Sequence, residues 1–265
     1  MEVLVSSMNK DMSLFKKMNI QTNAIIINQT PDISGNFSYK QQIFDDKTWK
    51  FYSMSEKGVG RSRNNALLRA SDDIVIMADE DEVFVDGYEK IINDAYSKYP
   101  EADMIVFDVN VHDRNGIKNR VKKTGRVRFF NSLKYGTVTF TFKRENILKS
   151  NIFFSLLFGG GAKFQSGEDS IFIAEVLTKG LRVYSYKELI ADVYNDASSW
   201  FLGYDEKYFV DRGALYKALA PKYYSFLILQ FWFRRAIKFD CSISQGKKLK
   251  YLFYGAKYFS EKGNE

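Results

Sequence analysis

The sequence predicts an α/β fold with a Rossmann-like, mostly parallel central sheet, an antiparallel portion after it, and a C-terminal helical extension. Three observations predict this fold. Short apolar runs alternate with helical patterns over residues 1–110, as in parallel, doubly wound sheets. Two later segments alternate apolar and polar residues, which is typical of antiparallel strands with one exposed face. From residue 205 onward the apolar residues recur at helical spacing.

The composition is that of a globular protein. The chain has 265 residues, 45% hydrophobic and 27% charged, with an unusually high aromatic content of 16%. The single cysteine, Cys241, excludes an intrachain disulfide and fits a reducing compartment. We expect no signal peptide, because no basic segment followed by a long apolar one opens the sequence. The apolar run at residues 226–233 is too short to cross a bilayer, which needs about 20 residues.

The basic character of the chain is concentrated in its tail. Residues 222–265 carry nine Lys or Arg and three acids, a net charge of +6 out of +7 for the whole chain. The preceding residues are therefore nearly neutral, which argues against nucleic-acid binding by the body of the protein.

Apolar runs and their flanking residues predict the elements of the first half. Residues 30–42 are polar, and we predict neither a helix nor a strand there. Asp86 and Glu89 have the spacing of a capping box at a helix start. The predicted strands are residues 3–7, 23–28, 48–53, 74–78 and 104–109, and the predicted helices are 10–19, 61–70 and 88–99.

The second half changes pattern. We expect antiparallel strands at 126–130 and 137–142, a glycine loop at 158–162, a helix at 171–179 and a strand at 181–186. Gly180 is well suited to end its helix as the C′ residue. Pro221 divides the predicted C-terminal helices into two segments.

Four acids follow the buried strand at residues 74–78. In open α/β sheets, ligands bind beyond the carboxyl ends of such strands. Asp79 and Asp81 are separated by one residue, so an extended chain turns both to the same side. A divalent metal would relieve the mutual repulsion of these carboxylates, although a solvated acidic turn is the commoner explanation of an isolated Asp-x-Asp.

Two further polar clusters occur in this half. Asn28 and Gln29 follow the second strand, and Arg61 and Arg63 stand at a helix start, where arginine and the helix terminus both favour phosphate. A nucleotide diphosphate is the natural joint ligand of these clusters and the acids. No Gly-x-Gly-x-x-Gly follows the first strand and no Gly-Lys-Ser/Thr loop occurs, which disfavours a dinucleotide enzyme and a P-loop NTPase.

Asp169 begins a helix next to the glycine loop. It is either a first-turn acid that complements the helix dipole or a general base for an attacking hydroxyl. The only histidine, His112, is interpreted as a surface turn residue. With no second histidine, serine-type hydrolysis finds no support.

Taken together, three motifs resemble those of glycosyltransferase family 2, which has the GT-A fold, in its bacterial capsular or exopolysaccharide form. Residues 58–66, GVGRSRNNA, resemble the family's Gly-x-x-x-Ala-Arg-Asn-x-Gly helix start, with Ser62 in place of Ala. Residues 78–82, ADEDE, resemble its Asp-x-Asp element, and residues 167–169, GED, its Glu-Asp pair. The resemblance extends over residues 2–235.

The resemblance implies an inverting transferase that moves a sugar from a UDP-sugar to a saccharide hydroxyl on a lipid-linked glycan precursor. Asp169 would be the catalytic base, and Asp81 with Asp79 would bind Mn²⁺ or Mg²⁺, with Asn195 as a further candidate ligand. The donor would contact Ser7, Asn28, Gln29, Arg61, Arg63 and Asp79, and the acceptor would contact Glu168, Gly160 and Trp200.

Two positions depart from the family pattern. Asn28 and Gln29 replace an aspartate that contacts uracil, and residues 194–200 lack a histidine that often binds the metal. The resemblance implies a catalytic domain at 1–203, with a nucleotide half at 1–110 and an acceptor half at 111–203, and an extension at 204–265.

The extension contains two basic, aromatic segments, residues 223–235 and 247–254. Such segments favour an anionic bilayer surface, although the first is equally compatible with a core or dimer helix. We therefore expect a cytoplasmic protein attached peripherally to the inner face of the membrane, with a homodimer as one open option and no nucleic-acid partner. Two alternatives remain: a metal-dependent nucleotidyltransferase, and a non-enzymatic membrane- or nucleic-acid-binding module.

Overall fold

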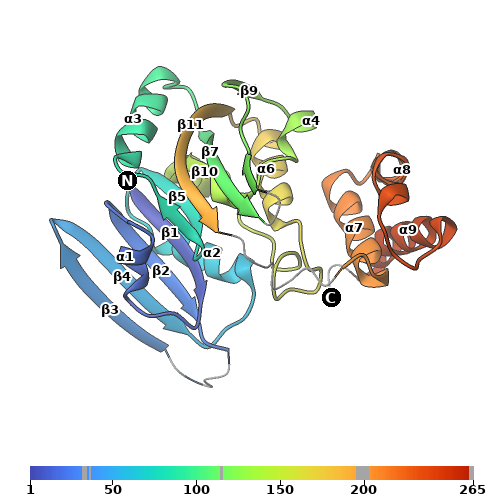
Figure 1. The fold of residues 1–265 in the computed structure, drawn as a ribbon, viewed down its shortest axis with the longest axis horizontal. Helices are drawn as coiled ribbons and strands as arrows, with labels where there is room; N and C mark the ends of the chain where they lie inside the picture. Colours follow the sequence, from blue (N-terminus) through green and yellow to red (C-terminus); the bar gives the residue numbers. More distant parts are fainter. Residues whose placement is uncertain (32–34, 36, 114–115, 195–202, 263–265) are drawn as a thin grey trace.

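A mixed, eleven-stranded sheet forms the centre of the protein (Figure 1). We analysed a computed structural model, which describes residues 1–31, 35, 37–113, 116–194 and 203–262. The strand order is β3-β4-β2-β1-β5-β10-β7-β11-β6, with β8 on β7 and β9 on β11. The strands are β1 (Glu2–Met8), β2 (Asn23–Gln29), β3 (Phe37–Phe44), β4 (Lys47–Met54), β5 (Ile74–Asp79), β6 (Glu82–Phe84), β7 (Met104–Asp113), β8 (Gly116–Asn119), β9 (Gly125–Val127), β10 (Phe140–Lys143) and β11 (Val183–Tyr194).

The sheet combines a parallel half with a mixed half. Strands β4, β2, β1 and β5 run parallel, so their carboxyl ends meet at one edge. Strand β10 enters antiparallel between β5 and β7, and β11 runs parallel to β7. The predicted α/β fold with an antiparallel portion and C-terminal helices is confirmed.

Helices cover both faces of the sheet, and a helical unit follows it (Figure 1). Alternate residues of each strand point to opposite faces, so Val3 and Val5 belong to one apolar cluster and Leu4 to another. The helices are α1 (Leu14–Lys17), α2 (Val59–Arg69), α3 (Tyr88–Lys98), α4 (Phe129–Ser132), α5 (Arg144–Lys149), α6 (Glu168–Thr178), α7 (Glu206–Leu219), α8 (Tyr224–Arg234) and α9 (Gln245–Lys262), with 3₁₀ turns η1 (Thr137–Thr139) and η2 (Ala236–Lys238).

Two glycines bring α7 and α9 into backbone contact. A Cβ on Gly213 would lie 1.9 Å from the Leu252 carbonyl oxygen, and one on Gly255 would lie 1.9 Å from the Val210 carbonyl oxygen. Around this crossing, α7, α8 and α9 share their own apolar core. None of the helices among the described residues is long and apolar enough to span a membrane.

Several local predictions are wrong. Residues 37–44 form β3, although residues 30–42 were predicted to form neither a helix nor a strand. Antiparallel pairing with β4 compensates for the exposure of every β3 residue. Residues 137–142 are a 3₁₀ turn followed by the start of a buried strand, rather than a half-exposed strand. Residues 128–130 lie beyond the end of β9, two of them in α4. Residues 203–262, the described C-terminal part, contain three α-helices instead of two.

The predicted capping box and the predicted position of His112 are also wrong. Asp86 accepts hydrogen bonds from Asn19 and Gln21, while Gly87, in a left-handed conformation, begins α3 without a side-chain cap. His112 lies within β7, where its Nε2 is 2.7 Å from Asp192 Oδ1. Gly180, by contrast, directly follows the C-cap of α6 with φ of 82°, as predicted.

Candidate active site

The candidate site lies at the carboxyl edge of the parallel strands, where β1, β2 and β5 end. Helix α2 begins there with Gly58 as its N-cap, which has φ of 118°. The motif residue Ser62 is fully buried and donates to the Ile27 carbonyl oxygen at 3.3 Å, which fixes α2 on β2. A hydroxyl at this position therefore has a structural role that the family's alanine could not fill.

Arg63 joins the strand that carries the acids to the helix that carries the predicted base. Its side chain is 4% exposed, and its two terminal nitrogens contact Asp79 at 2.9 and 3.0 Å and Glu168 at 2.8 Å. The two carboxylates beside it keep the pKa of the guanidinium above its ordinary value despite burial. Because Asp79 ends β5 and Glu168 begins α6, one side chain fixes the distance between these elements.

The four acids at residues 79–82 have different environments. Glu80 accepts from the Met8 backbone N–H at 2.7 Å and pairs with Lys10 at 3.2 Å. Glu82 is buried and accepts from the Asp79 N–H at 2.7 Å, and burial raises its pKa well above the ordinary value. The Glu82 side chain thus acts as an internal brace that holds the turn.

Asp81 is the acid of this turn that best fits a cation. Burial and repulsion by Asp79 raise the pKa of Asp81 to about 6, and no ion pair to its carboxylate is found within the described residues. A divalent cation would relieve both costs, and carboxylate oxygens are its usual ligands. Asp79 is less free to ligate, since both its oxygens face Arg63. In the part of the chain that the structure describes, no group of three or more His, Cys, Asp or Glu residues is arranged to hold a metal.

Asp169 lies half-buried in the first turn of α6. Burial, reinforced by the charge of Glu168 and partly offset by that of Arg63, raises the pKa of Asp169 to about 6. One of its oxygens accepts from the Ser170 N–H at 2.6 Å. The other faces Gly136, where a Cβ would lie 3.3 Å away. A partly desolvated carboxylate with a pKa near neutrality is suited to accept a proton from a hydroxyl.

The glycine loop packs against the start of α2. The Gly160 carbonyl accepts from the Val59 N–H at 2.9 Å, and a Cβ on Gly159 would lie 2.7 Å from Val59 and 2.8 Å from Glu168. The absence of side chains therefore serves close packing between this loop and the α2–α6 junction. Gly160 itself remains partly exposed, so its predicted contact with an acceptor stays a prediction.

The predicted donor-binding residues fall into two groups. The Asn28 amide accepts from the Lys10 N–H at 2.8 Å and donates to the Lys10 carbonyl at 3.1 Å, with Ser7 Oγ at 3.3 Å. Gln29 donates to the Gly58 carbonyl at 3.1 Å. These amides hold the loop after β1 and the start of α2, while Arg61 is exposed at the same helix start.

Asn195 and Trp200, the candidate metal and acceptor contacts, lie outside the described residues. The interaction that sequence reasoning missed is the pairing of Arg63 with Glu168, which are 105 residues apart. Each of the two residues belongs to a sequence motif, which indicated that it is functionally important. Nothing in the sequence indicated that Arg63 and Glu168 contact each other.

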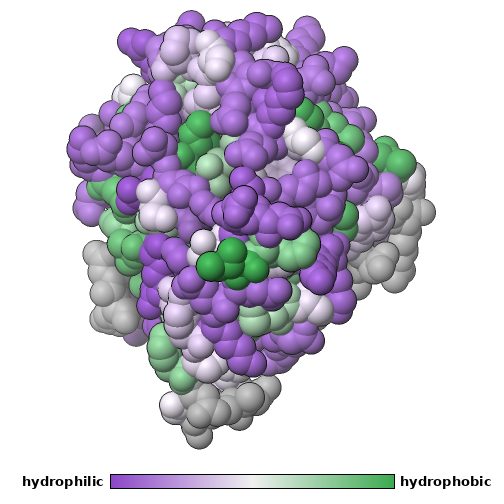
Figure 2. All heavy atoms as spheres, turned by 90° about the vertical axis from the view of Figure 1, so that its left-hand side faces the viewer, coloured by the Kyte–Doolittle hydropathy of each residue, from purple (hydrophilic) through white to green (hydrophobic). Residues whose placement is uncertain are grey.

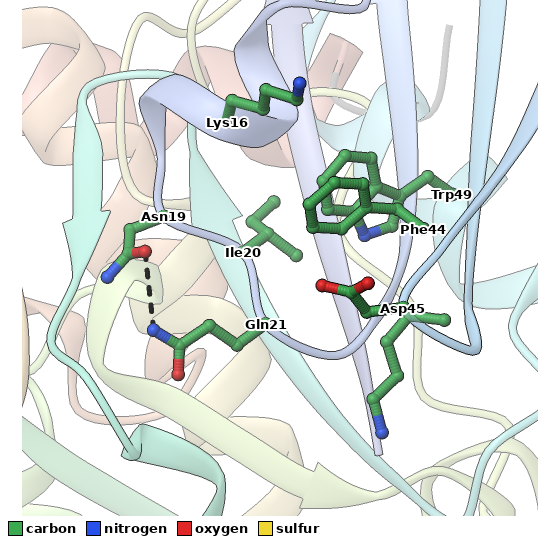
Figure 3. Close-up of a pocket in the computed structure, with 8 residues that line it drawn as sticks. Lys16, Asn19, Ile20, Gln21, Phe44, Asp45 and Trp49 are labelled. Atoms are coloured by element: carbon green, nitrogen blue, oxygen red, sulfur yellow. Dashed lines mark hydrogen bonds between the residues drawn. The ribbon is translucent and has the colours of Figure 1, made fainter.

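A cavity of about 310 Å³ lies elsewhere, at the amino-terminal ends of β2 and β4 (Figure 3). Phe44 and Trp49 stack on one side of it, and Asn19 and Gln21 are hydrogen-bonded to each other on the other. Because the predicted ligand residues follow the carboxyl ends of the strands, this cavity is separate from the candidate site.

No protein-family model matches the sequence, and no curated protein matches it. Solved structures match nearly the whole chain. Residues 1–349 of S. aureus TarS in complex with UDP-GlcNAc have a TM-score of 0.62 at 14% identity, covering 98% of this chain and 72% of that one. The same protein in complex with UDP has a TM-score of 0.58 at 14% identity, covering 98% and 71%. The chain has a GT-A-like glycosyltransferase fold.

Proposed function

We propose that the chain is a glycosyltransferase of family 2 that transfers a sugar from a UDP-sugar to a saccharide hydroxyl with inversion. The observation that carries the proposal is the Arg63 bridge. It ties Asp79, two residues before Asp81, to Glu168, which directly precedes Asp169. Asp81 and Asp169 both have a pKa raised to about 6. The GT-A-like fold supports the donor class, since two similar structures contain UDP-GlcNAc and UDP.

In this proposal different acidic residues assist the leaving group, UDP, and the attacking group, the acceptor hydroxyl. Asp81 would hold Mn²⁺ or Mg²⁺, and a bound cation would supply Lewis-acid stabilisation of the negative charge on the UDP leaving group. Arg61, exposed at the start of α2, would contact phosphate oxygens. Arg63 would position the acids through its two ion pairs rather than contact the donor.

Asp169 would accept the proton of the acceptor hydroxyl while that hydroxyl attacks the anomeric carbon from the face opposite UDP. A single displacement of this kind turns an α-linked donor into a β-linked product. A lipid-linked saccharide in bacterial surface polysaccharide synthesis is the acceptor class that we propose.

The test is the Asp169→Asn variant, assayed for transfer or hydrolysis with a panel of UDP-sugars. General-base catalysis contributes about 10²–10⁴-fold, so turnover should fall by at least about 10²-fold while UDP binding is retained. Asp94→Asn, an exposed change in α3, is the matched control and should leave turnover unchanged. Because Asp169 must be ionised, the wild-type rate should rise as the pH passes through about 6. Wild-type turnover in Asp169→Asn would refute the assignment.

A further inference from the structure

Helix α8 exposes a stripe of large apolar side chains. Tyr223, Phe226, Leu229, Phe233 and Ile237 are 72%, 65%, 47%, 68% and 37% exposed. Phe226, Leu229 and Phe233 lie within α8 at intervals of three and four residues, so these three share one face of the helix. Tyr223 directly precedes α8, and Ile237 lies in η2 after the helix ends. We refer to these five residues as the α8 stripe.

The α8 stripe is additional to the apolar surface that α8 needs for folding. The opposite side of the helix is already buried, with Ile228 fully buried and Phe231 9% exposed in the core shared with Phe209 and Leu252. Helix α8 packs on α7, α9 and η2 and leaves the stripe outward. Contiguous exposed apolar surface of this kind marks a binding surface more often than isolated exposed residues do.

Cations flank the α8 stripe in the sequence, and the first acid that follows them is Asp240. Lys222 precedes α8, Arg234 ends it, and Arg235 and Lys238 follow it, all exposed. Residues 212–239 contain no Asp or Glu. Lys217, in the last turn of α7, also lies here, with its Nζ 4.3 Å from the centre of the Tyr224 ring. An apolar stripe with exposed cations at both ends of its segment is complementary to an anionic lipid surface, which offers acyl chains and negative headgroups together.

The other basic, aromatic segment is largely part of the fold. In residues 247–254 of α9, Lys248 is 1% exposed and donates to the Ala236 and Phe239 carbonyls, and Leu252 is fully buried. Of the two segments, therefore, the one with α8 carries the stripe of exposed apolar side chains.

The edge strand β3 also exposes apolar residues, but the charges at its end have mixed signs, since Asp45, Asp46 and Lys47 follow Phe44 in the sequence. Phe37 and Ile43 are 64% and 71% exposed there, and Lys40 is the only charged residue in the strand. Figure 2 looks onto the side of the molecule where β3 lies, and its hydrophobic residues stand in small groups among hydrophilic ones. Nothing on this side favours one occupant over another.

We propose that the α8 stripe docks the protein on an anionic lipid surface, with its aromatic side chains at the headgroup boundary and the flanking Lys and Arg on the headgroups. Helix α8 has 11 residues, so it would lie in the plane of the interface rather than cross it. The proposal rests on the exposed face and its charges and is independent of the proposed reaction.

The test is co-sedimentation of the full chain with vesicles of equal parts phosphatidylglycerol and phosphatidylcholine. The variant Phe226→Ser/Phe233→Ser removes the two most exposed phenylalanines of α8. Each buried phenylalanine contributes roughly a 10-fold gain in partitioning, so we expect about a 100-fold loss in the double variant. Phe130→Ser, at a side chain 95% exposed in α4, is the matched control and should bind as the wild type does.

A second pair of variants tests the charges. Arg234→Gln/Lys238→Gln should weaken binding by about 30-fold, since each surface cation contributes roughly 5-fold on anionic membranes. Lys122→Gln/Lys123→Gln makes the same charge change at exposed positions distant from α8 in the sequence and should weaken binding clearly less. Circular dichroism of each variant establishes that it is folded.

Three results would overturn the proposal. The first is wild-type vesicle binding by folded Phe226→Ser/Phe233→Ser. The second is equal binding to vesicles of phosphatidylcholine alone. The third is sedimentation equilibrium of the wild type showing a dimer that this variant abolishes, because the stripe would then be covered by a second copy of the chain.

Discussion

Replacing Arg63 by Met should destabilise the protein strongly, because it removes the only cation seen to pair with Asp79 and Glu168 among the described residues. Losing one partner of a buried ion pair costs about 3–5 kcal/mol. The Asp79 side chain is 33% exposed and that of Glu168 is 12% exposed, so water can solvate part of the stranded charge. We therefore expect Arg63→Met to lower the free energy of unfolding by about 3 kcal/mol, near the lower end of that range. The total free energy of unfolding of a typical protein is about 5–15 kcal/mol.

Urea unfolding at neutral pH measures this loss. Arg61→Met is the matched control, because it changes an exposed arginine two residues earlier in the same helix, and its effect should stay within about 0.5 kcal/mol. In the double variant Arg63→Met/Glu168→Gln, part of the stability should return, since one of the two stranded carboxylates is then neutral.

A functional readout separates a positioning role from a merely structural one. Arg63 lowers the pKa of Asp169, so without Arg63 that pKa rises further and the onset of activity should move above about pH 6. Two results would refute the role that we assign to the Arg63 bridge. One is a decrease in the free energy of unfolding of less than about 1 kcal/mol in Arg63→Met, and the other is an unchanged pH at which the activity begins.

Two further predictions concern Asp81 and the crossing of α7 with α9. The folded-state pKa of Asp81 is raised from 3.8 to about 6. The free energy of unfolding therefore falls as the pH rises from about 4 through about 6, because the folded protein resists the ionisation of Asp81. Asp81→Asn should therefore stabilise the metal-free protein near pH 7 by at most about 3 kcal/mol and should have no effect on stability below about pH 4. Thermal melts at both pH values measure the two effects. Equal effects of the substitution at both pH values would contradict the prediction. Gly213→Ala should destabilise the helical unit by about 3 kcal/mol in urea unfolding, because the new Cβ meets the Leu252 carbonyl at 1.9 Å. Gly246→Ala, with nothing within 4 Å of its Cβ, is the control, and comparable losses in the two variants would show that α7 and α9 do not cross as described.

The sequence was most informative where one local pattern determined the outcome. The unbroken apolar run from Ile74 to Ala78 predicted a strand buried on both faces, and four acids after it marked the carboxyl edge of the sheet. Local patterns did not predict an element whose formation depends on pairing with a neighbouring strand. Strand β3 has no buried residue of its own and exists because β4 pairs with it along its whole length.

The same distinction applies to the candidate site. Its motifs were visible, because each occupies a short segment at a strand end or a helix start. The ion pairs of Arg63 were not, since they join residues 16 and 105 positions apart through the packing of α2 and α6 on the sheet. Which of the two basic tail segments is exposed also depended on tertiary structure, because both have similar composition and only α9 inserts its lysine, Lys248, into the fold.

The most direct test of the central claim is calorimetric titration of UDP into the full chain with and without Mn²⁺. We expect saturable binding of one UDP per chain that is stronger with Mn²⁺, and loss of the Mn²⁺-dependent part in Asp81→Asn. Binding should be unchanged in Phe226→Ser/Phe233→Ser, which lies outside the site. No binding of UDP by the folded wild type, with or without Mn²⁺, would contradict the proposal that this sheet edge is a UDP-sugar site.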